Sequence, residues 1–222
     1  MDNLVGVIRV LTTEDPELLA AHGRIIEADY GLPTFTRCIP DQPKGIYDDE
    51  TERVALPKIV ALGREMVSQG ATAILVSCAA DPAVAELRSE LKVPVIGAGS
   101  AASTVAVSLA EKVGILNLTE GAPGPVRNLL GNRYVGQDSP RGVMNTLDLM
   151  TDWGAEAALE AARRLAGLGA GALVLACTGY ATIGMAAELR RRMGILAVDP
   201  VRAAGLMAWY ALGAPRRKAG ES

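Results

Sequence analysis

The sequence predicts an α/β fold made of two similar parallel-sheet domains related by a pseudo-two-fold axis. Short β-branched runs alternate with helical patterns along all 222 residues, which is typical of parallel strands joined by crossover helices. The block at 70–78 (GATAILVSC) recurs at 169–177 (GAGALVLAC), 99 residues later. A second match, of 85–88 with 187–190 (AELR in both), indicates two homologous units.

Four apolar runs in the first half are predicted as strands. They cover residues 4–11, 34–39, 73–76 and 93–96. The first helix is expected to begin at Asp15-Pro16, since aspartate is a good N-cap and proline suits the first helical position, and to stop near Gly31. Another helix leads to Gly70. The polar stretch 40–53 is interpreted as a long loop, either a functional lid or a mobile excursion.

The second half repeats this alternation. Its predicted strands are 113–116, 172–175 and 195–198. Helices are expected after Gly121, through Leu159 and Leu165, over 186–192 and over 201–212. No linker or low-complexity segment separates the halves, so the two units follow one another directly.

Charge and composition exclude several classes of function. There are 22 Lys and Arg against 25 Asp and Glu, a net charge of −3, so no overall field attracts nucleic acid. No apolar run reaches the ~18 residues of a membrane span. The first residues lack the basic segment of a secretory signal, so we expect a cytoplasmic protein. With one histidine (His22, interpreted as a satisfied, partly buried residue) and three cysteines, no metal site or disulfide framework is predicted.

Cys78 and Cys177 occupy equivalent positions in the repeat, each directly after a buried apolar strand. Ligands of open parallel sheets bind at the carboxyl ends of the strands. Each thiol is therefore expected at the mouth of its unit, near a helix N-terminus that lowers its pKa. Across a cleft, one thiolate and one thiol can remove and return a proton on opposite faces of a carbon acid without a cofactor. The alternative is that both are small buried core residues; Cys38, which has no counterpart, is interpreted as structural.

Three short sequence blocks lie at the ends of predicted strands: 77–82 (SCAADP), 94–99 (PVIGAG) and 176–180 (ACTGY). The first and the third contain the two cysteines, and Asp199 precedes the last predicted helix. With these the sequence resembles the aspartate/glutamate/hydantoin racemase superfamily, and most of all its hydantoin racemases. The resemblance implies an aspartate-racemase-like fold and cofactor-independent racemisation by the two cysteines between the domains. It implies a first domain of 1–98 with the C-terminal helix, 200–222, a second of 99–199, and a homo-oligomer, dimer or higher.

The strand ends and the resemblance together nominate substrate-binding residues. These are Arg9, Ala79, Asp81, Asn117, Thr119, Asn145, Thr146, Thr178 and Gly179. The segment 117–119 could bind a carboxylate or ring imide, or instead cap a helix. The pair 145–146 matches a substrate-lining loop of the superfamily. Thr178 and Gly179 would offer backbone N–H groups to an enolate-like oxygen.

Two charged candidates have ordinary alternatives. Arg9 could bind a substrate oxyanion or make an ion pair at a strand edge. Asp81 could orient Cys78 or cap a helix before Pro82. Related amino-acid racemases commonly place Asn-Thr after the first cysteine, where this chain has Ala-Ala at 79–80. The Asp-Pro that follows is typical of the hydantoin branch.

We therefore expect a cofactor-independent racemase or epimerase whose small-molecule substrate is a 5-substituted hydantoin or an amino-acid relative. Two alternatives remain open. One is a cysteine-dependent cis–trans isomerase of an unsaturated diacid, or a decarboxylase, although the second cysteine argues against the latter. The other is a non-catalytic protein that binds a small ligand and has inert thiols. No nucleic-acid or membrane partner is expected.

Overall fold

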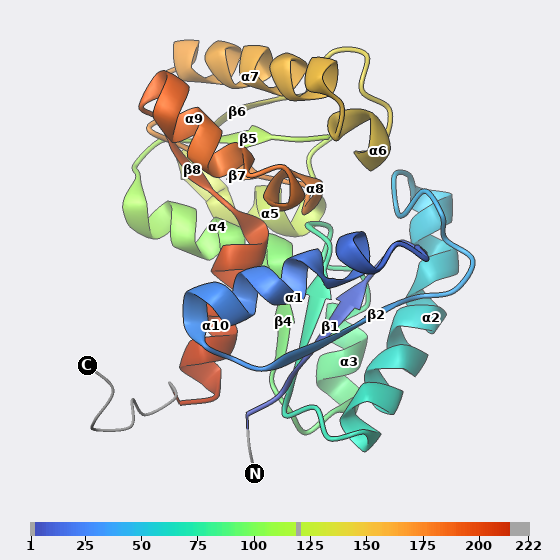
Figure 1. Ribbon diagram of the computed structural model, residues 1–222. Coiled ribbons are helices and arrows are strands. Elements are labelled where there is room, and N and C mark those ends of the chain that lie inside the picture. The colour runs from blue at the N-terminus through green and yellow to red at the C-terminus, as the bar shows by residue number, and fades with distance from the viewer. Residues whose placement is uncertain (1–2, 119–120, 214–222) are drawn as a thin grey trace.

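The computed structural model describes residues 3–118 and 121–213 (Figure 1). In this part of the chain it holds two four-stranded sheets, and every strand pair in them is parallel. Helices cover the sheets (Figure 1). The predicted α/β class with two similar units is therefore confirmed.

The first sheet and its helices come from the first half of the chain. The elements are β1 (Val5–Arg9), α1 (Pro16–Tyr30), β2 (Thr34–Cys38), α2 (Asp49–Ser68), β3 (Ala73–Ser77), α3 (Val84–Glu90), β4 (Val95–Gly97) and α4 (Ala98–Leu109). The strand order is β2-β1-β3-β4. Helix α1 has the predicted ends: the Asp15 side chain accepts from the first N–H groups, and Gly31 follows with φ of 64°.

The second half repeats this topology. The elements are β5 (Val113–Leu116), α5 (Gly124–Leu130), the 3-10 helix η1 (Gly131–Arg133), β6 (Tyr134–Asp138), α6 (Thr146–Leu149), α7 (Asp152–Gly167), β7 (Ala172–Leu175), α8 (Gly179–Thr182), α9 (Met185–Met193), β8 (Leu196–Val198) and α10 (Pro200–Ala211). The strand order β6-β5-β7-β8 is the first order shifted by four strands. The two units therefore share one fold, as the internal repeat predicts.

Three of the longer elements differ from the expectation: α2, β6 and α4, a helix of 12 residues that none of the predicted helices covers. Helix α2 begins at Asp49, inside the stretch interpreted as a loop, because Asp48 and Thr51 form a capping box that starts a helix among acidic residues. The loop is correspondingly shorter than 40–53. Strand β6 is not predicted at all, since it is a half-buried edge strand whose sequence, YVGQD, has no apolar run.

A core of small side chains joins the two units. Helix α10 packs against both α1 and α4 (Figure 1). Alanines dominate the buried surface of α4 and α10: Ala98, Ala101, Ala102, Ala106, Ala203, Ala204 and Ala208. The same cluster includes Val7 and Leu75 of the first sheet and Ile115 and Val174 of the second. The division into 1–98 with 200–222, and 99–199, stays a prediction.

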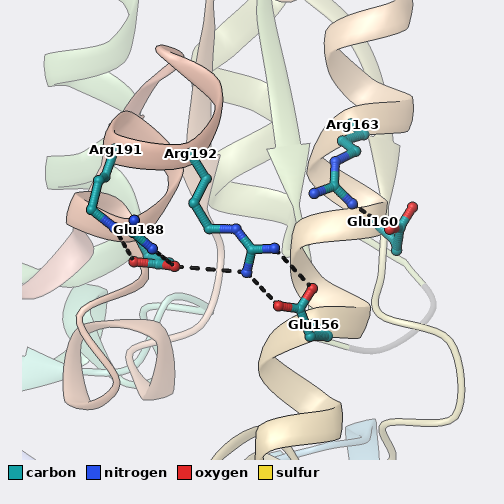
Figure 2. Close-up of polar contacts among 6 residues, drawn as sticks. All are labelled: Glu156, Glu160, Arg163, Glu188, Arg191 and Arg192. Carbon is teal, nitrogen blue, oxygen red and sulfur yellow. Dashed lines mark hydrogen bonds and ion pairs between the residues drawn. The ribbon is translucent and has the colours of Figure 1, made fainter.

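An ion pair links helices α7 and α9 at the surface (Figure 2). Arg192 of α9 pairs with Glu156 of α7 and lies 3.7 Å from Glu188, which also pairs with Arg191. Water and salt screen such partly exposed pairs. We therefore expect Glu156→Gln to change the free energy of unfolding by less than about 1 kcal/mol. Urea denaturation of both proteins measures this, and a loss above about 2 kcal/mol would show that the pair is a main support of the α7–α9 contact.

Candidate active site

A cavity of about 410 Å³ lies where strands of both sheets end. Its wall is formed by residues at the carboxyl ends of β1, β3, β5 and β7 and by the loop before α2. Cys78, after β3, and Cys177, after β7, both line it. The two repeat cysteines, one from each unit, therefore meet in a single cavity.

Cys78 begins a turn with an uncommon backbone. Asp81 and Ala83 have φ of 53° and 59°, in the left-handed region that residues other than glycine rarely adopt. This turn delays helix α3 until Val84. Burial raises the pKa of the Cys78 thiol to about 12, and nearby negative charges, among them Glu52, act in the same direction. Cys78 is therefore a protonated thiol at neutral pH.

Cys177 has more polar contacts at its sulfur. The Gly179 N–H donates to Sγ over 3.4 Å, and the Thr146 hydroxyl oxygen lies 4.0 Å from Sγ. Burial raises the pKa of the Cys177 thiol, while these contacts and the Arg9 guanidinium oppose the rise. Cys177 is the thiol of the pair whose ionised form is better supported. The Gly179 N–H serves this sulfur in the structure rather than an enolate-like oxygen.

The expectation that a helix N-terminus lowers the pKa of each thiol is wrong. Both pKa values are raised, because burial disfavours the thiolate more than the backbone N–H groups favour it. Helix α3 starts six residues after Cys78, and α8, after Cys177, has four residues. Neither thiol therefore lies at the N-terminus of a long helix, where the dipole would act.

Most predicted substrate-binding residues line this cavity. They are Arg9, Ala79, Asn117, Thr146, Thr178 and Gly179. Asp81 and Asn145 are not part of its wall. Thr119 lies outside the described residues. The ends of the strands thus assemble most of the wall, while the side chains of Asp81 and Asn145 bind other partners.

Arg9 is buried at the end of β1, and its charge is held by helix α1. The guanidinium donates to the carbonyl oxygens of Leu18 and Leu19, over 2.5 and 3.4 Å. Burial lowers the pKa of Arg9 to about 10. The ion pair at a strand edge, suggested as an alternative from the sequence, is not its arrangement. Arg9 instead places a buried positive charge close to Cys177.

Asp81 holds the start of helix α4. Its carboxylate accepts from the backbone N–H groups of Gly99 and Ser100, each over 2.7 Å. It therefore caps α4, and neither of the two expected roles, orienting Cys78 or capping a helix before Pro82, is its contact in the structure. The bond ties the turn that carries the first thiol to a helix packed between the two sheets.

Asn145 and Asn117 also use their side chains locally. Asn145 caps α6 by accepting from its first N–H groups, which leaves the neighbouring Thr146 at the cavity wall. The Asn117 amide donates to the Gly121 carbonyl. Asn117 does not cap the following helix, since the N-cap of α5 is Pro123. It is a buried residue of the cavity wall.

The loop before α2 forms a wall that the sequence does not assign to the site. Gly45, Ile46, Tyr47 and Asp48 of the loop line the cavity, and Asp49 and Glu52 in the first turn of α2 continue this wall. Hydrogen bonds anchor the loop: the Gln42 N–H donates to the Thr12 hydroxyl over 2.7 Å, and the Lys58 amine donates to the Pro40 carbonyl over 2.9 Å. The length and polarity of the stretch 40–53 are the sequence features that suggest a functional loop here, one of the two interpretations given for it. The loop is an anchored part of the site.

No metal centre is evident in the described residues. Between residues 3 and 118 and between 121 and 213, no three His, Cys, Asp or Glu side chains are placed to hold a metal ion together. None of the helices in these two ranges has the length and apolar character needed to cross a bilayer.

The chain is similar to known proteins over most of its length. Residues 17–208 match the family model for Asp/Glu/hydantoin racemase. The hydantoin racemase of Rhizobium meliloti is 28% identical over 200 residues, covering 78% of this chain and 74% of that protein. Allantoin racemase from Klebsiella pneumoniae superposes with a TM-score of 0.83 at 26% identity, covering 99% of this chain and 92% of that one. Allantoin racemase from Pseudomonas fluorescens (TM-score 0.79, 22% identity, 99% and 100% covered) shares the fold.

Proposed function

The chain belongs to the Asp/Glu/hydantoin racemase family, and on that premise we propose that it racemises a small ring compound of the hydantoin type. The reaction is proton transfer between Cys78 and Cys177, without a cofactor. The observation that carries the proposal is that two cysteines at equivalent positions of an internal repeat line one cavity. The 28% identity to a hydantoin racemase and the 26% identity to an allantoin racemase support the ring substrate.

Each turnover moves one proton off the substrate and one proton onto it. The thiolate of one cysteine takes the proton from the carbon, so an S–H bond forms as the C–H bond breaks. The carbanion is delocalised onto the adjacent carbonyl oxygen. The other cysteine then delivers its own S–H proton to the opposite face. The product is the mirror image of the substrate, and the two sulfurs have exchanged protonation states.

Cys177 is the thiol that ionises first in this scheme. Gly179 and Thr146 contact its sulfur, and Arg9 supplies a nearby positive charge. Cys78, whose pKa is raised to about 12, then holds the proton that is delivered. The roles are exchanged when the other enantiomer reacts.

The charges of the cavity favour a neutral ring over an amino acid with an acidic side chain. Among the described lining residues, Asp48, Asp49 and Glu52 are acidic and Arg9 is the one cation. The Arg9 guanidinium already donates to carbonyls of α1. Carboxylates close to a bound anion repel it. An imide ring has no negative charge to be repelled, whereas aspartate and glutamate carry two carboxylates.

A substrate panel tests the proposal. We expect the enzyme to abolish the optical rotation of 5-substituted hydantoins with a kcat/KM about 100-fold or more above its value for aspartate or glutamate. Faster racemisation of glutamate would contradict the ring substrate. Conversion of maleate to fumarate, with no racemisation of any member, would replace the proposal with the cis–trans isomerase. Binding of a hydantoin without turnover, with both thiols unreactive towards iodoacetamide, would indicate a non-catalytic protein.

The raised pKa values of the two thiols set the direction of the pH dependence. One thiol must be ionised and the other protonated, and at neutral pH both are protonated. We expect kcat/KM to rise about tenfold per pH unit between about pH 7 and 9. The rise continues towards the pKa of Cys177, which lies above its ordinary 9.0. It reverses only when Cys78 also ionises, near a pKa of about 12. Initial rates over this range, corrected for spontaneous racemisation, measure it; a flat profile from pH 6 to 8 would contradict the raised values.

A further inference from the structure

His22, the single histidine of the chain, is fully buried on α1 with a partner at each ring nitrogen. Nδ1 lies 2.7 Å from the Ser77 hydroxyl oxygen, and Nε2 lies 3.0 Å from the Thr182 hydroxyl oxygen. Ser77 immediately precedes Cys78. Thr182 is the last residue of α8, the short helix that begins two residues after Cys177. The ring therefore joins the two segments that carry the thiols.

A second bond links the same two segments directly. The Thr178 hydroxyl donates to the Ser77 carbonyl oxygen over 3.2 Å. Ser77 is thus held at its hydroxyl through His22 and at its carbonyl by Thr178. Helices α1 and α8 contact each other, as this bridge requires (Figure 1). Ser77 and Thr178 are the neighbours of Cys78 and Cys177 along the chain, so these bonds join the backbone segments that carry the two thiols.

The bridge depends on a neutral imidazole. Burial keeps the pKa of His22 well below its ordinary value, and the nearby Arg9 guanidinium acts in the same direction. A neutral ring has one N–H donor and one acceptor nitrogen. Serine and threonine hydroxyls can each donate or accept, so both ring nitrogens are satisfied in either tautomer. The ring is a fixed connector that keeps one protonation state over the pH range of the reaction.

We propose that His22 is a positioning residue for the two-cysteine reaction. It holds Ser77 and Thr182 together and thereby fixes the two thiols at the separation at which one removes a proton while the other delivers one. His22 is not part of the cavity wall, so it acts through its two partners. A displacement of about 1 Å in such a geometry can cost about 100-fold in rate. The inference rests on the proposed racemisation.

Two variants loosen the bridge at one end. Thr182→Val keeps the size of the side chain and removes the hydroxyl that faces Nε2. His22→Asn keeps a polar group within reach of Ser77 and withdraws the group that reaches Thr182. For both we expect kcat to fall about tenfold or more while KM changes by less than about twofold. Thr104→Val is the matched control, since Thr104 is exposed on α4 and lies outside the cavity wall.

A second readout separates positioning from stability. In D₂O with a single enantiomer, well-placed thiols put deuterium into the inverted product and leave the recovered substrate unlabelled. If the second thiol is too far away, the first one exchanges its proton with solvent and returns deuterium to the same face. The ratio of label in recovered substrate to label in inverted product should therefore rise several-fold in Thr182→Val. A loss of stability alone leaves this ratio unchanged.

The outcomes separate this inference from the proposed function. Lower kcat and a higher label ratio in Thr182→Val, with Thr104→Val like the wild type, support the positioning role. A wild-type kcat and label ratio in Thr182→Val overturn it, whether or not the variant melts at a lower temperature. If His22→Asn does not fold, Thr182→Val alone decides. A wild-type enzyme that racemises no member of the substrate panel contradicts the proposed function instead.

Discussion

Replacing Cys78 or Cys177 by serine is expected to lower the rate of racemisation by about 10³-fold. Serine keeps the shape of the side chain, but its hydroxyl is a much weaker acid than a thiol. It can therefore neither supply a thiolate-like base nor deliver a proton readily. Both thiols line the same cavity, and the proposed reaction uses one on each face of the substrate, so loss of either should be equally severe.

The third cysteine provides the control for this experiment. Cys38 ends β2 and is not part of the cavity wall, so Cys38→Ser should racemise at a rate close to that of the wild type. Polarimetry of each purified variant, with folding checked by circular dichroism, gives the comparison. Either single variant at Cys78 or Cys177 that keeps more than about a tenth of the wild-type rate would rule out a two-cysteine mechanism.

Gly99→Ala is expected to lower the free energy of unfolding by about 3 kcal/mol. A Cβ at this position would overlap the Ala79 carbonyl oxygen and lie 2.8 Å from its carbon. That carbonyl is backbone, and it cannot retreat freely, because the Asp81 carboxylate, two residues further on, binds the N–H groups of Gly99 and Ser100. The turn after Cys78 would have to shift, so we expect activity to fall together with stability.

Thermal unfolding measures this effect. A loss of about 3 kcal/mol corresponds to a decrease in Tm of about 9 °C for a chain of this size. Gly167→Ala is the matched control: Gly167 lies in α7, and nothing within 4 Å would meet its Cβ. It should leave stability unchanged or raise it by up to about 1 kcal/mol, since alanine favours a helix. A Gly99→Ala variant as stable as the wild type would mean that the 79–81 turn moves freely.

The fold could be predicted largely from local patterns and from the repeat. Asp15-Pro16 and Gly31 place the ends of α1 correctly because a capping side chain and a left-handed glycine act on neighbouring backbone groups. Strands β5 and β7 match the predicted runs because parallel strands buried on both faces are continuously apolar. The edge strand β6 is missed because it is less buried than β5 and β7, and its sequence therefore has no continuous apolar run.

The site could be predicted only in part. The equivalent positions of Cys78 and Cys177 indicate that they belong together, and one cavity contains both. Contacts between distant residues are not visible in the sequence: His22 meets Ser77 55 positions away and Thr182 160 positions away. The pKa values of the thiols were expected in the wrong direction, since the depth of burial depends on how both units enclose the cavity.

The most direct test of two-cysteine racemisation is to determine which enantiomer carries the deuterium label when the reaction starts from a single enantiomer. The wild-type enzyme is given one enantiomer of a 5-substituted hydantoin in D₂O, and a parallel sample without enzyme gives the spontaneous exchange. Early in the reaction, proton NMR after chiral separation should show deuterium at the stereogenic carbon of the inverted product and ordinary hydrogen in the remaining substrate. Equal labelling of both enantiomers from the start would contradict two facing thiols, because it requires a single base that exchanges with solvent on either face.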